Sequence, residues 1–170
     1  MKKIVSIVGM KKSGKTTLIE KLVPILKEKG YKVGTIKHDA HSFEIDHPGT
    51  DSYRHFKAGA NTTIIASKNK TAIIKSSSSP MKLEEIAERF LYDMDIIITE
   101  GYKKENKPKI EVTRSPKEKI LCSPNDNLIA VASDYYLELS IPNFNINDIE
   151  SIAEFIEERF LKKSNRNEKE

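Results

Sequence analysis

Hydrophobic positions along the chain form short runs that alternate with stretches of helical periodicity. The runs are apolar, rich in β-branched residues and seldom interrupted by polar residues, which predicts strands that are covered on both faces of a parallel sheet. A strand, a crossover helix and a second strand predict a parallel pair with a right-handed connection. The predicted strands of this sheet are 4–8, 32–37, 96–99, 110–113, 128–133 and 141–144.

Helical periodicity predicts three helices, which begin near Gly14, Ser79 and Asn147. Ser79 with Pro80 is a typical start of a helix. Serine caps the first turn, and proline lacks a backbone N–H that the first turn does not use. Asn147, with Glu150 three residues on, resembles a capping box. The predicted core faces are Leu18, Leu22, Ile25 and Leu26 in the first helix, Leu83, Ile86, Ala87, Phe90 and Leu91 in the second, and Ile149, Ile152, Ala153, Ile156 and Phe160 in the third.

The middle of the chain differs in composition from the rest. Residues 38–60 are rich in polar, ionisable and turn residues, and a loop of this length with scattered charges and aromatic residues favours a functional role. We expect residues 51–57 to form a short helix within this loop. Residues 62–66 and 71–75 are two strand-like runs with a short connection, which predicts an antiparallel hairpin.

The first strand runs directly into the segment Gly9–Thr16, which fits the phosphate-binding pattern G-x-x-x-x-G-K-[ST]. A buried strand precedes it and a helix follows it, as the motif requires. The glycines permit a tight turn with converging backbone N–H groups, and the helix adds the positive end of its dipole. Lys15 would reach the β- and γ-phosphates, and the Thr16 hydroxyl would join the coordination of Mg²⁺. The sequence therefore predicts that a nucleoside triphosphate binds here.

Two acidic residues follow predicted strands and are candidate catalytic residues. Glu100 follows the strand 96–99 in the layout of a Walker B strand, which places a carboxylate beside Mg²⁺ or its waters. Because ligands gather at the carboxyl ends of parallel strands, we expect Thr16 and Glu100 to bind the metal together. Asp39 follows the second strand, where it would bind a magnesium-coordinated water or orient an attacking water. The alternatives are a strand-capping role for Glu100 and a loop-ordering role for Asp39.

These elements predict an α/β fold of the P-loop NTPase class. It would have three layers, with a mostly parallel sheet flanked by helices and an antiparallel hairpin around residues 62–75. A length of 170 residues suits one nucleotide-binding domain, which we expect to span residues 1–161. Residues 162–170 are polar and charged and are expected to be a disordered tail.

Composition and charge exclude several classes of protein. The net charge of +4 suits a protein that handles polyphosphates, but lysines and glutamates are interspersed, so we expect no nucleic-acid partner. The single cysteine, Cys122, excludes an intrachain disulfide and favours a reducing compartment. No apolar run approaches the length of a membrane span, so we expect a soluble, cytoplasmic protein without a membrane partner.

All four histidines, His38, His41, His47 and His55, lie in the polar middle segment. Their spacing matches no compact zinc pattern, and the lone cysteine is far along the chain. A metal-binding role for these histidines is the less favoured interpretation, and it would fit a GTP-dependent metallochaperone.

Several blocks of the sequence together resemble the MobB family of molybdopterin-guanine dinucleotide biosynthesis adapters. The phosphate loop is generic, whereas Lys-His-Asp-Ala-His at 37–41 and Asp-Ser-Tyr-Arg-His at 51–55 are more particular. Thr-Glu-Gly-Tyr-Lys at 99–103 and Pro-Lys-Ile-Glu at 108–111 add to the resemblance. It covers about residues 1–161.

The resemblance implies a homodimer that binds GTP and Mg²⁺, hydrolyses GTP weakly, and assists the molybdenum cofactor guanylyltransferase, which joins GMP to molybdopterin. Asp39 and Glu100 would be the acidic residues that act beside the bound nucleotide and Mg²⁺. The loop with His41, Asp51 and Arg54 would be the surface for molybdopterin or the partner enzyme. Arg54 suits the terminal phosphate of molybdopterin, because its guanidinium fork matches phosphate oxygens. The residues implied in nucleotide binding at the loop are Gly9, Lys12, Ser13, Gly14, Lys15, Thr16 and Thr17.

GTPases usually recognise guanine with an Asn-Lys-x-Asp segment. The sequence has no such segment, because the nearest candidate, residues 106–109, lacks the aspartate. Asp134, which follows the strand 128–133, is the best substitute. A carboxylate there would accept both N–H groups of the guanine edge, which adenine does not offer. An ordinary turn at the end of the strand is the alternative.

Two other classes of P-loop protein fit the motif less well. A small P-loop kinase needs a lid with arginines over the phosphates, and the chain has only four arginines: Arg54, Arg89, Arg114 and Arg159. A partitioning-type ATPase carries a second lysine early in the loop, at the position that Met10 occupies here.

Overall fold

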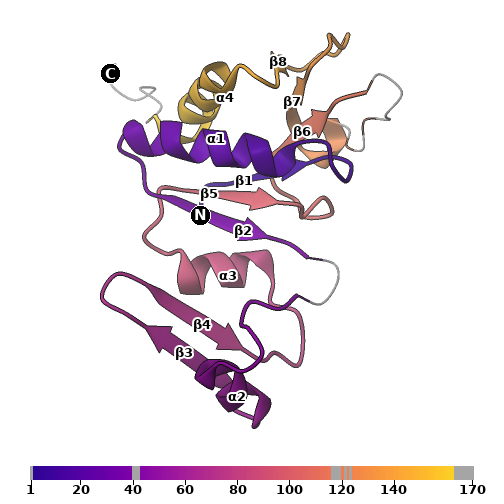
Figure 1. The fold of residues 1–170 in the computed structure, drawn as a ribbon. Coiled ribbons are helices and arrows are strands. Elements are labelled where there is room, and N and C mark those ends of the chain that lie inside the picture. The colour runs from indigo at the N-terminus through magenta and orange to yellow at the C-terminus, as the bar shows by residue number, and fades with distance from the viewer. Residues whose placement is uncertain (1, 40–42, 116–119, 121, 123, 163–170) are drawn as a thin grey trace. The chain divides into compact units, whose positions relative to one another are not determined.

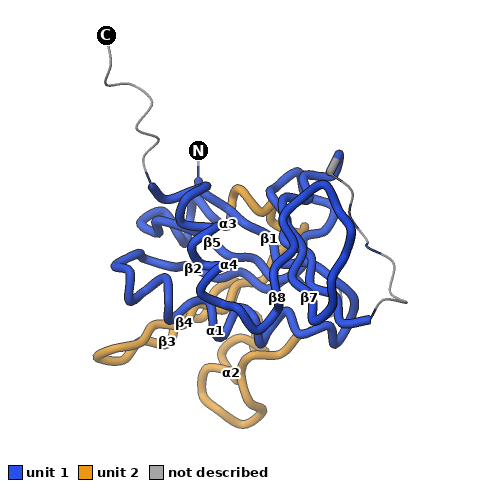
Figure 2. Tube along the Cα trace, turned by 90° about the horizontal axis from the view of Figure 1, so that it is seen from above, with its two compact units in different colours: residues 1–38, 86–170 blue, residues 39–85 orange. Residues whose placement is uncertain are grey.

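The computed structural model describes residues 2–39, 43–115, 120, 122 and 124–162. The chain divides into two compact units, residues 1–38 with 86–170 and residues 39–85, which Figure 2 distinguishes by colour. The predicted tail lies outside the described residues from 163 onwards. The expectation of one domain over residues 1–161 stays a prediction.

The first unit is built on a sheet of six strands in the order β2-β5-β1-β6-β7-β8. The strands are β1 (Ile4–Val8), β2 (Val33–Lys37), β5 (Ile96–Glu100), β6 (Lys109–Thr113), β7 (Leu128–Ser133) and β8 (Asn143–Asn145). Every described strand pair of this sheet is parallel, and Ile7 of β1 pairs with Glu100 on one side and Ile110 on the other. The carboxyl ends of these strands therefore lie along one edge of the sheet, where ligands gather in open α/β folds.

Helices cover both faces of this sheet (Figure 1). α1 (Lys15–Glu28) and α4 (Ile149–Ile156) pack side by side on one face. The part of α3 (Leu83–Phe90) that belongs to this unit, from Ile86, lies on the opposite face, where the following Leu91 packs over Gly34. The predicted three-layer α/β fold is confirmed. The helical residues buried in the main core are Leu18, Leu22, Leu26, Ile149, Ile152, Ala153 and Ile156.

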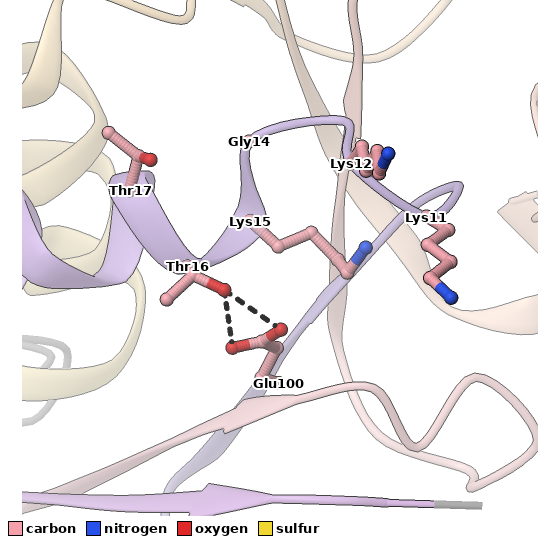
Figure 3. Close-up of a pocket in the computed structure, with 7 residues that line it drawn as sticks. All are labelled: Lys11, Lys12, Gly14, Lys15, Thr16, Thr17 and Glu100. Atoms are coloured by element: carbon pink, nitrogen blue, oxygen red, sulfur yellow. Dashed lines mark hydrogen bonds between the residues drawn. The ribbon is translucent and has the colours of Figure 1, made fainter.

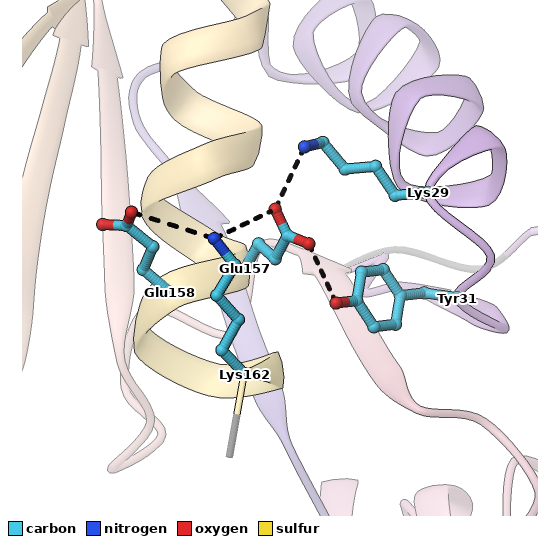
Figure 4. Close-up of polar contacts among 5 residues, drawn as sticks. All are labelled: Lys29, Tyr31, Glu157, Glu158 and Lys162. Atoms are coloured by element: carbon cyan, nitrogen blue, oxygen red, sulfur yellow. Dashed lines mark hydrogen bonds and ion pairs between the residues drawn. The ribbon is translucent and has the colours of Figure 1, made fainter. Parts of the chain in front are cut away.

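One carboxylate joins the end of α4 to the end of α1 (Figure 4). Glu157, in the π-helical turn Glu157–Leu161, accepts hydrogen bonds from Lys29 Nζ at 3.0 Å and from the Tyr31 hydroxyl at 2.9 Å. Lys162 Nζ lies 4.0 Å from the same carboxylate. The bond from Lys29, followed by that from Tyr31, holds the pKa of Glu157 below its ordinary value. The same contact raises the pKa of Lys29.

Two charged side chains of β6 are buried and both have backbone partners. The Lys109 ammonium donates to the carbonyls of Glu105 at 2.6 Å, Lys107 at 3.3 Å and Asp126 at 2.6 Å. Glu111 accepts from the backbone N–H of Cys122 at 2.9 Å. Burial raises the pKa of the Cys122 thiol to about 11, which disfavours the nucleophilic thiolate form.

The second unit holds α2 (Asp51–Lys57) and a two-stranded antiparallel sheet of β3 (Thr62–Ala66) and β4 (Thr71–Lys75). α2 begins after Thr50, whose hydroxyl accepts a hydrogen bond from the backbone N–H of Tyr53 at 3.3 Å. The predicted hairpin and the predicted short helix are therefore confirmed. Ile64 and Ile73 pair across the two strands and are 61% and 49% exposed, so the hairpin carries an exposed apolar pair.

The starts of two helices were predicted wrongly. α3 begins at Leu83 and not at Pro80. Before it, the Ser77 hydroxyl donates to the Ser79 carbonyl, a local bond of the kind that competes with the start of a helix. Phe90, a predicted core residue of this helix, is 45% exposed.

The third helix is capped by Asp148 and not by Asn147. The Asp148 carboxylate accepts from the backbone N–H of Ser151 at 3.2 Å and from its hydroxyl at 2.7 Å, so this side chain takes the capping position predicted for Asn147. None of the helices in the described residues is long and apolar enough to cross a membrane.

Candidate phosphate-binding site

The loop between β1 and α1 has a backbone that only glycine permits at its two ends. Gly9 and Gly14 have φ values of +142° and +103°, and Lys12 between them has φ +66°. A Cβ added at Gly9 would lie 2.2 Å from the Val112 carbonyl oxygen and 2.9 Å from Ser13 Oγ. The loop is thus pressed against the end of β6, which leaves no room for a side chain at Gly9.

Side chains of the loop and of β5 line a cavity of about 290 Å³ beside the start of α1 (Figure 3). Lys15 Nζ donates to the carbonyls of Met10 at 2.6 Å and Gly9 at 3.2 Å, so its ammonium is held over the loop. Three lysines and one glutamate give the cavity a positive balance, which suits a polyphosphate. The lining residues are Lys11, Lys12, Gly14, Lys15, Thr16, Thr17 and Glu100.

Thr16 and Glu100 meet at one corner of this cavity. The Thr16 hydroxyl lies 3.0 Å from each of the two Glu100 carboxylate oxygens, and Lys37 Nζ lies 3.9 Å from Glu100 Oε1. The contact follows from the strand order, because β5 is the neighbour of β1, from which the loop leads to Thr16. A hydroxyl and a carboxylate are the oxygen donors that Mg²⁺ accepts, so this pair fits the predicted metal site.

Magnesium would take its remaining ligands from phosphates and water, as is usual for this ion. Across the residues that the structure describes, no group of three or more His, Cys, Asp or Glu side chains is placed to hold a metal ion.

Most of the residues predicted for the phosphate site come together, and others lie elsewhere. Ser13 is 3% exposed, and its Oγ has no hydrogen-bond partner among the described residues. Asp39 is an exposed residue of the second unit, so its role at the metal stays a prediction. His41 lies outside the described residues. Asp51 and Arg54 form an exposed ion pair at 3.7 Å on α2.

Asp134 lines a second cavity in the first unit, of about 230 Å³, at the carboxyl ends of β7 and β8. The Ser133 hydroxyl donates to Asn143 Oδ1 at 3.1 Å, which joins the last residue of β7 to the first residue of β8. Rings and amides complete its wall. The lining residues are Ser133, Asp134, Tyr135, Tyr136, Asn143, Phe144 and Asn145.

Two basic residues at the phosphate loop were not predicted from the sequence. Lys11 lines the cavity, and its place inside the motif was the available signal. Arg114 Nε donates to the Ser13 carbonyl at 3.2 Å. Arg114 directly follows the predicted strand 110–113, but only the order of the strands, with β6 beside β1, shows that this strand ends at the loop.

Comparisons with known proteins agree with this geometry. Residues 4–134 match the model of the family MobB, described as molybdopterin guanine dinucleotide synthesis protein B. The chain is 37% identical over 155 residues to the molybdopterin-guanine dinucleotide biosynthesis adapter protein of Haemophilus influenzae, covering 91% of this chain and 87% of that protein. It is 38% identical over 161 residues to the protein of the same name from Escherichia coli, covering 90% of each.

The fold is also similar to a solved structure. A crystal structure of molybdopterin-guanine biosynthesis protein B superimposes with a TM-score of 0.76 at 34% sequence identity, covering 94% of this chain and 99% of the other.

Proposed function

The chain belongs to the MobB family, and we propose that it is a GTP-binding adapter that assists the attachment of GMP to molybdopterin during molybdenum cofactor biosynthesis. The observation that carries the proposal is the positive cavity beside the phosphate loop, where Lys15, Thr16 and Glu100 lie together. The names of the relatives supply the pathway. The residues of the cavity support the binding of a nucleotide.

The phosphate end of GTP would lie against the loop 9–16. Backbone N–H groups of the loop and of the first turn of α1 would bind the phosphates, helped by the positive end of the helix dipole. Lys15 would exchange the carbonyls of Gly9 and Met10 for phosphate oxygens. Thr16 and Glu100 would hold Mg²⁺, which neutralises charge on the β- and γ-phosphates when it is bound.

The guanine end would lie in the cavity at Asp134. Neighbouring strands are about 4.8 Å apart, so β7, two strands from β1, lies roughly 10 Å away, a span that the ribose bridges together with part of the phosphate chain. The Asp134 carboxylate would accept the two N–H groups of the guanine edge. The rings of Tyr135, Tyr136 and Phe144 in the wall offer surfaces on which a base packs.

Hydrolysis of GTP by this chain would be slow, and the output of the bound nucleotide would be a protein contact. Asp39 would orient the attacking water. The exposed Asp51 and Arg54 on α2, together with His41, would form the surface for the guanylyltransferase or for molybdopterin. Arg54 would bind the terminal phosphate of the pterin through its two-pronged guanidinium.

The chain would act as a homodimer joined through the hairpin of β3 and β4. An isolated two-stranded ribbon is marginally stable in water, and this one exposes the apolar pair Ile64 and Ile73. A second copy would cover this pair and the open strand edges.

The deciding experiment adds the purified chain to a guanylyltransferase reaction with molybdopterin and GTP. We expect the chain to raise the yield of guanylylated cofactor, and Lys15→Ala to remove most of that gain. Lys21→Ala, an exposed lysine of α1 that does not line the cavity, is the matched control and should behave as the parent. Calorimetry should show weaker GTP binding by at least about tenfold for Lys15→Ala. Equal binding by the two variants would refute the nucleotide site.

A further inference from the structure

We propose that Arg114 is a positioning residue of the phosphate loop. By holding the Ser13 carbonyl it fixes the Ser13–Gly14 peptide, so that the Gly14 N–H points into the triphosphate cavity. This role rests on the proposed nucleotide binding, because it concerns how the loop is kept ready for phosphate.

The first support is the place of Arg114 in the sheet. It directly follows β6, and β6 pairs with β1 through Val8 and Glu111, so the end of β6 lies beside the start of the loop. Arg114 Nε donates to the Ser13 carbonyl at 3.2 Å in a partly buried hydrogen bond. A charged donor on a backbone carbonyl makes one of the stronger hydrogen bonds available in proteins.

The second support is the contact between the guanidinium and Gly14. A Cβ added at Gly14 would lie 3.1 Å from Arg114 Nε and 3.2 Å from Nη2, so the guanidinium rests against the bare backbone of this glycine. Gly14 also has a φ of +103°, which an L-residue rarely adopts. The glycine therefore serves the turn and the close approach of Arg114 together.

The geometry of a trans peptide explains how this contact sets the direction of the Gly14 N–H. The C=O and N–H of one peptide unit point in opposite directions because the unit is planar. Since the Ser13 oxygen points toward Arg114, the Gly14 N–H points away from it, and Gly14 is among the residues that line the phosphate cavity. The guanidinium charge also polarises this peptide so that its N–H attracts an anion more strongly.

Among the printed contacts of the loop, one further support is long and the other two come from Lys15. Ser13 N–H donates to the Met10 carbonyl at a long 3.3 Å, and Lys15 Nζ bridges the Met10 and Gly9 carbonyls. Lys15 gives up these carbonyls when it turns to a phosphate. Arg114 holds the loop from the strand side, so its contact persists with ligand bound.

The test compares Arg114→Met and Arg114→Lys with Arg159→Met as the matched control. Arg159 is an exposed arginine of the same unit that stacks on Phe155, in the turn that follows α4. Calorimetry with GTP and Mg²⁺ should show affinity about tenfold or more weaker for Arg114→Met, partly restored in Arg114→Lys, and unchanged for Arg159→Met. In ¹⁵N-labelled protein, GTP should move the Gly14 amide resonance less in Arg114→Met than in the parent.

A merely structural role would lower the melting temperature of the ligand-free protein and leave affinity and the Gly14 response unchanged, which would overturn the inference. The inference would also fail if Arg114→Lys bound GTP no better than Arg114→Met. If Arg114→Met does not fold, parental affinity in Arg114→Lys would overturn the proposal, and a severalfold loss would support it. Failure of the parent itself to bind GTP refutes the nucleotide site, and this inference with it.

Discussion

Replacing Gly9 with alanine tests whether the contact between the phosphate loop and β6 determines the shape of the loop. The new Cβ would lie 2.2 Å from the Val112 carbonyl oxygen, and a backbone carbonyl in the middle of a sheet has little freedom to move. The φ of +142° adds a strained conformation that costs about 1–3 kcal/mol for a residue with a side chain. Relief of the clash must displace the loop or the end of β6.

The expected loss in free energy of unfolding is about 3 kcal/mol or more when strain and clash act together. For a chain of this length that corresponds to a melting temperature lower by roughly 6–12 °C. Gly30→Ala is the matched control, because Gly30 also has a positive φ, of +90°, but a Cβ there meets no atom within 4 Å. We expect a loss of about 1 kcal/mol for the control, from backbone strain alone.

Urea denaturation monitored by circular dichroism measures both variants, and calorimetry with GTP measures the site. Gly9→Ala should lose stability and GTP affinity together, whereas Gly30→Ala should keep the affinity of the parent. Equal losses of stability in the two variants would show that the close approach to Val112 adds nothing to the cost of backbone strain, and they would contradict this prediction.

Three further predictions follow from other contacts. Asp134→Ala should narrow the preference for GTP over ATP in competition binding, and equal affinity of the parent for both nucleotides would remove the guanine proposal. The lowered pKa of Glu157 gives a stabilisation that is present above the ordinary carboxyl pKa of about 4.3 and lost as pH falls below it. Glu157→Gln should therefore lower the melting temperature at pH 7 and reduce its further decline in acid, and a parallel decline in parent and variant would contradict this. Ile73→Lys should sediment as a folded monomer, and a monomeric parent would exclude the hairpin dimer.

The phosphate loop could be read from the sequence because everything that shapes it is local. Gly9, Gly14, Lys15 and Thr16 stand in one segment, and the strand and helix around it are marked by strong periodicity. The partner acid Glu100 is distant in sequence, but it ends a strand, and the rule that ligands gather at the carboxyl ends of parallel strands suffices to place it beside Thr16.

Arg114 could not be found in this way, because its role depends on which strand lies next to β1. The residues themselves do not state whether β6 or another strand takes that place. The helix starts were misjudged for a different reason. Asn147 and Asp148 are adjacent good caps, and the choice between them depends on which side chain reaches Ser151. At Ser79, a competing hydrogen bond within the serine segment outweighs the helix signal of Pro80.

The hydrogen bond between Thr16 and Glu100 also affects the entropy of ligand binding. Ordering a free glutamate side chain costs up to about 2 kcal/mol, which equals a loss of more than tenfold in affinity. Here both carboxylate oxygens already contact the threonine hydroxyl at 3.0 Å, which favours this arrangement of the two side chains before any ligand arrives. A cation that enters this corner redirects an existing pair of oxygen donors and does not have to order two mobile side chains, so the site is preorganised for it.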